Sequence, residues 1–286
     1  MRDRLEHTLL EEENPAMKVP GLVLGGLLAA SLLVGAAGCA PAGLPPTAAQ
    51  QEHSLIVFAA VTLTDAFMEI GSAFEAAHPG AKVEFNFAGS QALRTQIEEG
   101  AAADVFASAN TKEMEALAGG GKLAGEAKPF VNNLLTIVAP ADNPAEVVTA
   151  QDLARPGLIL VLAAEEAPVG KYARQALGQL ESLYGAGYRD SVLANVVSNE
   201  DNVKQVVAKV QLGEADAGIV YQSDVVAAPQ LTRIEIPAEA NVVAVFPIAV
   251  LRGSAESALA QDFIDYVLSD AGQATLHGWG FRSPAP

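Results

Sequence analysis

The sequence predicts an α/β protein with mainly parallel β-sheets. From Ser54 onward, short apolar runs alternate with longer segments in which apolar residues recur every three or four positions. This alternation is typical of strands that alternate with helices, and that order favours parallel strands. The chain has 286 residues, of which 50% are hydrophobic, so a large core is possible. The pattern gives about nine strands, which favours two smaller sheets over one.

Each predicted element has a local pattern. Phe67, Ile70 and Phe74 share one helical face, whereas Val83 and Phe85 alternate as in a strand. The predicted strands are residues 54–60, 82–89, 104–110, 133–140, 158–163, 194–198, 217–221, 231–237 and 243–251. The predicted helices are residues 64–80, 90–100, 111–121, 169–184, 201–213 and 257–272, with a helical turn at 149–154.

Residues 1–38 are predicted to form an export signal. An uncharged apolar run, residues 21–38, follows Lys18 and ends in small residues directly before Cys39. A basic residue, an apolar stretch and small residues before a cleavage point are typical of such signals. The alternative is an uncleaved membrane helix, because the run is nearly long enough to span a bilayer. Met17 is a second candidate start, which would leave residues 1–16 outside the protein.

Cys39 is the only cysteine, and the small residues before it resemble the lipobox of bacterial lipoproteins. In those proteins the cysteine is lipidated and becomes the first mature residue; Ala36 stands where leucine is usual. Residues 39–52 are therefore predicted to be the lipidated cysteine and a flexible tether, rich in Pro, Ala and Gln. A lone cysteine also excludes an intrachain disulfide and a CxxC metal site.

The formal charge of −17 argues against nucleic acid as a partner, because an acidic surface repels phosphate backbones. The sequence contains no GxSxG, GxxxxGK[ST] or strand-linked GxGxxG motif, so no nucleotide or other cofactor is predicted. The four histidines have no metal-binding spacing, and no metal cation site is predicted. An enzyme would need a general base. Asp65, Asp104, Asp201 and Asp224 lie near the loops described next, but no histidine or paired carboxylate accompanies them.

Five places have the pattern of an anion cradle, in which a strand ends, small or hydroxyl residues follow, and a helix begins. The N–H groups of a helix start and the helix dipole favour a negative ligand there. Four of these places also have a plain structural explanation: Thr62 or Thr64, Ser90, and Asp201 or Asn202 as helix caps, and Tyr221 as a core residue. The segments are residues 59–66, 87–93, 167–172, 198–205 and 218–224.

Taken together and in this order, the segments resemble the molybdate-binding proteins of bacterial ABC transporters. The resemblance covers residues 54–286 and rests on VFAAVTLTDAF, FAGSQALRTQIEEGAAADVFASAN, APVGKYARQAL, NVKQVVAKVQLGEADAGIVYQSD and GWGF. It implies a two-lobed periplasmic-binding-protein type II fold, in which each lobe is a mixed, mainly parallel sheet flanked by helices. The implied lobes are residues 53–137 plus 244–286, and residues 138–243, with the ligand in the cleft between them.

The resemblance also implies which groups bind the ligand. Two hydroxyls, Thr62 and Ser90, two backbone N–H groups, of Val169 and Val203, and the Tyr221 hydroxyl would surround a tetrahedral oxyanion. Thr62 stands where the family usually has serine. Such a shell offers donors only, so it should favour a fully ionised anion over partly protonated phosphate, whose buried O–H would lack an acceptor.

The resemblance implies that the ligand is molybdate, with tungstate and sulfate as alternatives within the same fold. An enzyme on a related two-lobed scaffold, or an adhesive surface lipoprotein, are alternatives of other classes. The implied partners are the permease subunits of an ABC importer and, through Cys39, the membrane. The protein is expected to be a monomer, extracytoplasmic or periplasmic, and anchored to the outer face of the cytoplasmic membrane.

Overall fold

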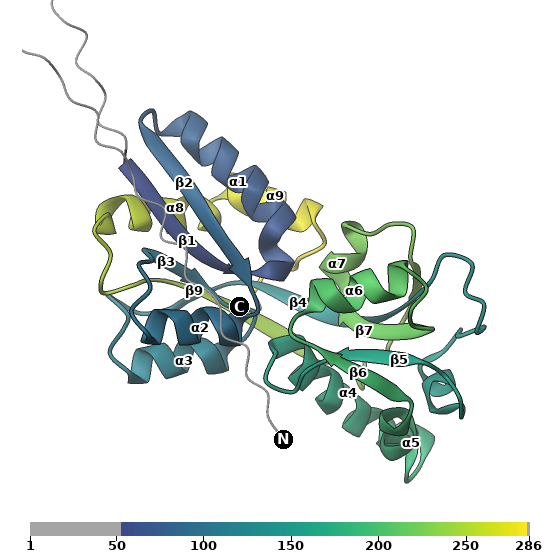
Figure 1. Ribbon diagram of the computed structural model, residues 1–286. Coiled ribbons are helices and arrows are strands. Elements are labelled where there is room, and N and C mark those ends of the chain that lie inside the picture. Colours follow the sequence, from purple (N-terminus) through teal and green to yellow (C-terminus); the bar gives the residue numbers. More distant parts are fainter. Residues whose placement is uncertain (1–52, 285–286) are drawn as a thin grey trace, which may run out of the picture. The chain divides into compact units, whose positions relative to one another are not determined.

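The computed structural model describes residues 53–284, which form two lobes of sheets flanked by helices (Figure 1). The predicted signal segment, Cys39 and the tether lie outside the described residues. The strands are β1 (His53–Ala60), β2 (Ala81–Ala88), β3 (Val105–Ala107), β4 (Lys128–Ala139), β5 (Leu160–Ala163), β6 (Val196–Glu200), β7 (Ala217–Tyr221), β8 (Thr232–Ile234) and β9 (Val243–Val250). The α-helices are α1 (Thr64–Ala77), α2 (Ser90–Glu98), α3 (Thr111–Gly119), α4 (Pro168–Tyr184), α5 (Tyr188–Ala194), α6 (Val203–Gln211), α7 (Gln222–Val226), α8 (Ser257–Leu268) and α9 (Asp270–Gly278), with 3-10 helices η1 (Val61–Leu63) and η2 (Ala150–Ala154).

The strands follow one hydrogen-bonded order, β2-β1-β3-β9-β4-β7-β5-β6, and β8 pairs with β4. In the first lobe β1 is parallel to β2 and β3, and in the second lobe β5 is parallel to β6 and β7. The pairings around β4 and β9 are antiparallel. The sheet is therefore mixed, with its parallel strands at the two ends and its antiparallel strands in the middle.

Strand β4 belongs to both lobes. Its residues 128–134 pair with β9, whereas residues 135–139 pair with β7 and β8. The sequence favoured two separate sheets; the structure joins them through this strand. The strand also begins at Lys128, five residues before the predicted start, because Pro129 obscures its pattern and the register shifts between Pro129 and Val131.

Helices cover both faces of each lobe's sheet (Figure 1). In the first lobe, α2 and α3 enclose one core layer, in which Leu93 and Leu117 are fully buried beside Phe106. On the other face, Phe67 of α1 packs edge-on against Phe263 of α8, with ring centroids 6.0 Å apart. In the second lobe, α4 and α6 lie on opposite faces of β5 and β7 (Figure 1).

Three helical features differ from the sequence prediction. Residues 188–194, expected to be a loop, form α5, and residues 222–226 form the short helix α7. The helix expected over 257–272 breaks at Ser269, whose hydroxyl accepts a hydrogen bond from Gly272 N–H and begins α9. A serine inside a predicted helix gives no sign in the sequence that it caps a second helix, so the break at Ser269 was not predicted.

The fold brings several strand-to-helix turns to one place. β1 leads into η1, β2 into α2, β5 into α4 and β6 into α6. Because the carboxyl ends of parallel strands meet at the same edge of a sheet, these helix starts gather between the lobes. Within residues 53–284, no helix has the length and apolar character needed to cross a membrane.

Candidate functional site

All five predicted ligand-binding residues line one small cavity between the lobes. The cavity has a volume of about 20 Å³, which suits one small ion rather than a sugar, peptide or nucleotide. Thr62, Ser90, Val169, Val203 and Tyr221 are each at most 6% exposed. The cavity is lined by Ala60, Val61, Thr62, Ala88, Gly89, Ser90, Ala109, Ala167, Pro168, Val169, Asn202, Val203 and Tyr221. None of these side chains carries a charge.

Ser90 is the first residue of α2, and its hydroxyl is oriented by a backbone bond. The oxygen accepts a hydrogen bond from Ala109 N–H at 3.0 Å. This contact occupies a lone pair and leaves the hydroxyl proton free to donate. Ser90 therefore faces the cavity as a fixed donor, and both Ser90 and Ala109 line it.

Val169 presents a backbone N–H at the start of α4. Pro168 occupies the first helical position, so the Val169 N–H is the first amide of this helix and has no intrahelical acceptor. The turn is held close to β5: a Cβ on Gly170 would lie only 2.0 Å from the Ala164 carbonyl oxygen. Glycine at this position thus allows the helix to start where its first N–H reaches the cavity.

Val203 is the first residue of α6, and the residue before it caps the helix. The Asn202 side-chain oxygen accepts a hydrogen bond from Gln205 N–H at 3.2 Å. The cap interpretation of Asn202 is therefore confirmed, although Asn202 also lines the cavity. The cap satisfies Gln205 and leaves the Val203 N–H without an acceptor within residues 53–284.

The Tyr221 hydroxyl is buried and has no hydrogen-bond partner within residues 53–284. The ring packs edge-on against Phe246, with centroids 5.6 Å apart. Burial, aided by Tyr172 and Asp224, raises the pKa of Tyr221 well above its usual value, so the phenol remains a neutral donor. A buried hydroxyl without a partner is costly, and a ligand oxygen in the cavity would satisfy it.

Thr62 differs from the other four groups because protein atoms already compete for its proton. Its Oγ1 lies 2.9 Å from Asp224 Oδ1 and 3.2 Å from Ser223 Oγ. Sequence reasoning did not assign Ser223 or Asp224 to the site. No local pattern marked them, because the short helix α7 that begins at Gln222 was not predicted either.

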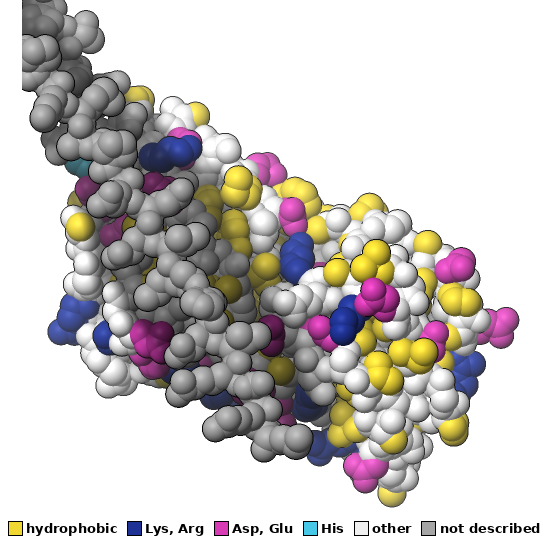
Figure 2. All heavy atoms as spheres, in the orientation of Figure 1, with side chains coloured by type: hydrophobic (Ala, Val, Ile, Leu, Met, Phe, Trp, Pro, Cys, Tyr) yellow, Lys and Arg dark blue, Asp and Glu magenta, His cyan; other side chains and the backbone are white. Residues whose placement is uncertain are grey.

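Outside the cavity, one ion pair and one hydrogen bond join the two lobes. Lys204 Nζ of α6 lies 3.0 Å from Asp65 Oδ2 of α1, and Gln91 Nε2 donates to the Asp201 carbonyl oxygen at 2.8 Å. Lys171 is exposed and does not line the cavity. Figure 2 shows acidic and basic side chains spread over the visible face. Within the described residues, no cluster of three or more His, Cys, Asp or Glu could hold a metal ion.

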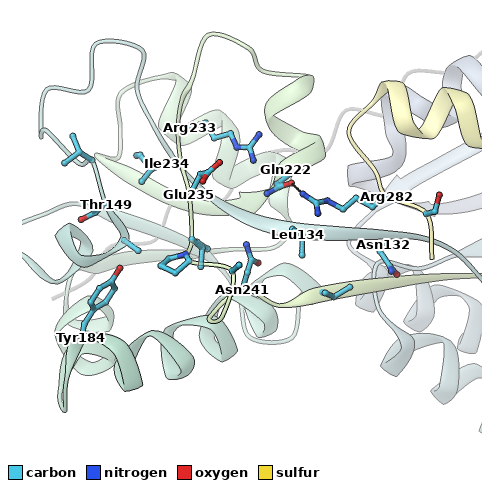
Figure 3. A pocket seen from close by; sticks show the side chains of 17 residues that line it. Asn132, Leu134, Thr149, Tyr184, Gln222, Arg233, Ile234, Glu235, Asn241 and Arg282 are labelled. Atoms are coloured by element: carbon cyan, nitrogen blue, oxygen red, sulfur yellow. Dashed lines mark hydrogen bonds between the residues drawn. The ribbon is translucent and has the colours of Figure 1, made fainter. Parts of the chain in front are cut away.

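A larger groove of about 980 Å³ lies elsewhere, along β4, β8 and β9 (Figure 3). Arg282 Nη2 donates to Gln222 Oε1 there at 3.0 Å, and Arg233 and Glu235 bring both signs of charge. None of the five predicted residues lines this groove. Its size does not suit a tetrahedral ion, so the small cavity is the better candidate site.

The comparisons with known proteins identify the family and the fold. Residues 55–282 match the model of the bacterial extracellular solute-binding protein family. A relative named molybdate-binding protein ModA, from Mycobacterium tuberculosis (strain ATCC 25618 / H37Rv), is 41% identical over 263 residues, covering 91% of this chain and 97% of the relative.

Two solved structures share the fold. The periplasmic molybdate-binding protein of Azotobacter vinelandii has a TM-score of 0.72 at 22% identity, covering 81% of this chain and 100% of that one. The sulfate-binding protein SubI of Mycobacterium tuberculosis H37Rv has a TM-score of 0.75 at 18% identity, covering 82% and 88%. The predicted two-lobed type II fold is thus confirmed. The match to the solute-binding family and to the 41% identical relative confirms the prediction of a binding protein rather than an enzyme. This chain belongs to the bacterial extracellular solute-binding protein family.

Proposed function

We propose that the protein captures molybdate outside the cytoplasm and delivers it to the permease of an ABC importer. The observation that carries this proposal is the small, buried, uncharged cavity into which several hydrogen-bond donors converge. The relatives named as molybdate-binding proteins support the choice of ligand. Thr62, Ser90, Val169, Val203 and Tyr221 are proposed to donate to the oxyanion.

A shell without Lys or Arg can bind a dianion, because hydrogen bonds to a charged acceptor are strong in a site that excludes water. It also selects against a protonated oxyanion. Hydrogen phosphate would bury an O–H without an acceptor, at a cost of about 1–3 kcal/mol. Molybdate, tungstate and sulfate are fully ionised at neutral pH, so the size of the cavity must separate sulfate from the two larger ions.

Calorimetric titration of the purified protein with four anions tests the proposal. We expect tight binding of molybdate and tungstate and poor binding of sulfate and phosphate. Sulfate is the second candidate because the fold is shared with a sulfate-binding protein. Equal affinities for sulfate and molybdate would contradict the assignment to molybdate.

We also propose the limits of the two lobes: residues 53–137 plus 244–286, and residues 138–243. The pairing of β4 supports a division within this strand, since residues 128–134 pair with β9 and residues 135–139 with β7 and β8. Movement of one lobe relative to the other, about β4 and β9, would open the cavity for the ligand.

The proposed location is the outer face of the cytoplasmic membrane, with a monomer held by lipidated Cys39. The lipobox-like residues before this cysteine support the proposal. Mass spectrometry of the protein extracted from the membrane fraction should find Cys39 as the first residue, carrying lipid, with residues 1–38 removed. A membrane-bound protein that retains the apolar segment and an unmodified Cys39 would instead indicate an uncleaved membrane helix.

A further inference from the structure

Asp224 is a carboxyl group buried directly behind the cavity wall. It is 1% exposed, does not line the cavity, and lies 2.9 Å from Thr62 Oγ1, which does. Its other oxygen, Oδ2, accepts a hydrogen bond from Tyr221 N–H at 3.1 Å. The Asp224 carboxyl therefore contacts two of the five residues proposed to hold the anion, through the Thr62 hydroxyl and the Tyr221 backbone N–H, but does not itself line the cavity.

The protonation of Asp224 determines what Thr62 offers to the cavity. A threonine hydroxyl has one proton. If Asp224 is ionised, Thr62 donates this proton to the carboxylate, and only lone pairs of Oγ1 remain for a ligand. If Asp224 carries a proton on Oδ1, that proton goes to Thr62 Oγ1, and the threonine proton is free to point into the cavity.

We propose that Asp224 is a positioning residue, and this inference rests on the proposed function. Asp224 must be protonated for Thr62 to donate to the oxyanion, so binding of the anion takes up one proton. Only a proton is transferred: it comes from solvent, forms an O–H bond at Asp224 Oδ1, and returns to solvent when the anion leaves. Ser223 Oγ, 3.2 Å from Thr62 Oγ1, is the competing neutral acceptor for the threonine proton. A charged oxyanion accepts more strongly than a neutral hydroxyl.

The burial of Asp224 favours its protonated form. Burial, with a smaller contribution from Asp65 of α1, raises the pKa of Asp224 to about 6, although Lys204 of α6, the Thr62 hydroxyl and the Tyr221 N–H lower it. The remaining contacts of Ser223 beside it are uncharged, since Asn133 Nδ2 donates to Ser223 Oγ at 2.8 Å. A dianion in the cavity adds negative charge close by, which raises the pKa again.

The affinity of the protein for molybdate is expected to depend on pH through Asp224. The binding-competent protonated form predominates below the pKa and is lost as the pH rises through it, so the affinity for molybdate should fall with increasing pH. For uptake of one proton, the fall approaches about tenfold per pH unit above the pKa. An ordinary site of neutral donors would show no such slope between pH 6 and 8.

Calorimetry of the full protein with molybdate, from pH 6 to 8, tests the inference. In two buffers of different ionisation enthalpy, the wild-type protein should take up close to one proton per anion at pH 7.5. Asp224→Asn mimics the protonated acid, because its amide can donate to Thr62 Oγ1 while its oxygen accepts from Tyr221 N–H. This variant should bind with no pH slope and more tightly than the wild-type protein at pH 8.

Asp65→Asn is the matched control, since it removes a nearby carboxylate that does not contact Thr62, and it should keep the wild-type slope. Binding by the wild-type protein that is independent of pH, with no proton uptake, would overturn this inference and leave the proposed function intact. Absence of molybdate binding at every pH would contradict both. The wild-type proton count needs no variant, so misfolding of Asp224→Asn would not prevent the test.

Discussion

Replacing Ser90 with alanine is expected to weaken molybdate binding by about 1.5–3 kcal/mol, roughly 10- to 150-fold, as for loss of a hydrogen bond to a charged group. The hydroxyl is held as a donor because its oxygen accepts from Ala109 N–H at 3.0 Å. The same change leaves the Ala109 N–H without its acceptor, so the free energy of unfolding should also fall. Calorimetry for affinity and denaturant unfolding for stability separate the two effects.

Ser108→Ala is the matched control for this variant. Ser108 is also fully buried, and its hydroxyl accepts a backbone bond from Asn110 N–H at 3.3 Å, but it does not line the cavity. It should lower stability without a comparable loss of affinity. Unchanged molybdate affinity in Ser90→Ala would remove Ser90 from the proposed shell.

Tyr221→Phe is expected to weaken molybdate binding by a similar amount, about 1.5–3 kcal/mol, without destabilising the free protein. The reason is that the Tyr221 hydroxyl is buried without a partner in the described residues, so its removal costs no protein hydrogen bond. The unfolding temperature of the free protein should therefore stay the same or rise. The increase in that temperature on adding molybdate should shrink.

Tyr188→Phe provides the contrasting control. Tyr188 is also buried, but its hydroxyl donates to the Ala150 carbonyl oxygen, far from the cavity. Its loss should lower the unfolding temperature and leave the affinity for molybdate unchanged. A Tyr221→Phe protein that binds as tightly as the wild-type protein would show that the Tyr221 hydroxyl does not reach the anion.

Much of the fold could be predicted from periodicity alone. Strand β7 has its predicted ends, and α2 and α4 begin within one residue of theirs, because a buried apolar run or a clear helical face marks each. The amino-terminal half of β4 and the helices α5 and α7 were missed. In those segments a proline or a short polar stretch hides the pattern, and tertiary pairing decides the conformation.

Part of the candidate site could also be predicted from local sequence patterns. Ser90, Val169 and Val203 stand at strand-to-helix turns, which leave a mark in sequence. The contact of Thr62 with Asp224 joins residues that are 162 positions apart, and no local pattern encodes it. The roles of the five residues as ligands remain predictions, and the variants above test Ser90 and Tyr221 directly.

The shared strands also bear on how the chain folds. β9 lies between β3 and β4 in the first lobe, yet in chain order it follows every strand of the second lobe. The first lobe therefore cannot complete its sheet until residues 243–250 have returned, and this long loop closure slows its folding. Because β4 pairs in both lobes, loss of either sheet removes partners from the other, and we expect denaturant to unfold the two together in a single cooperative transition.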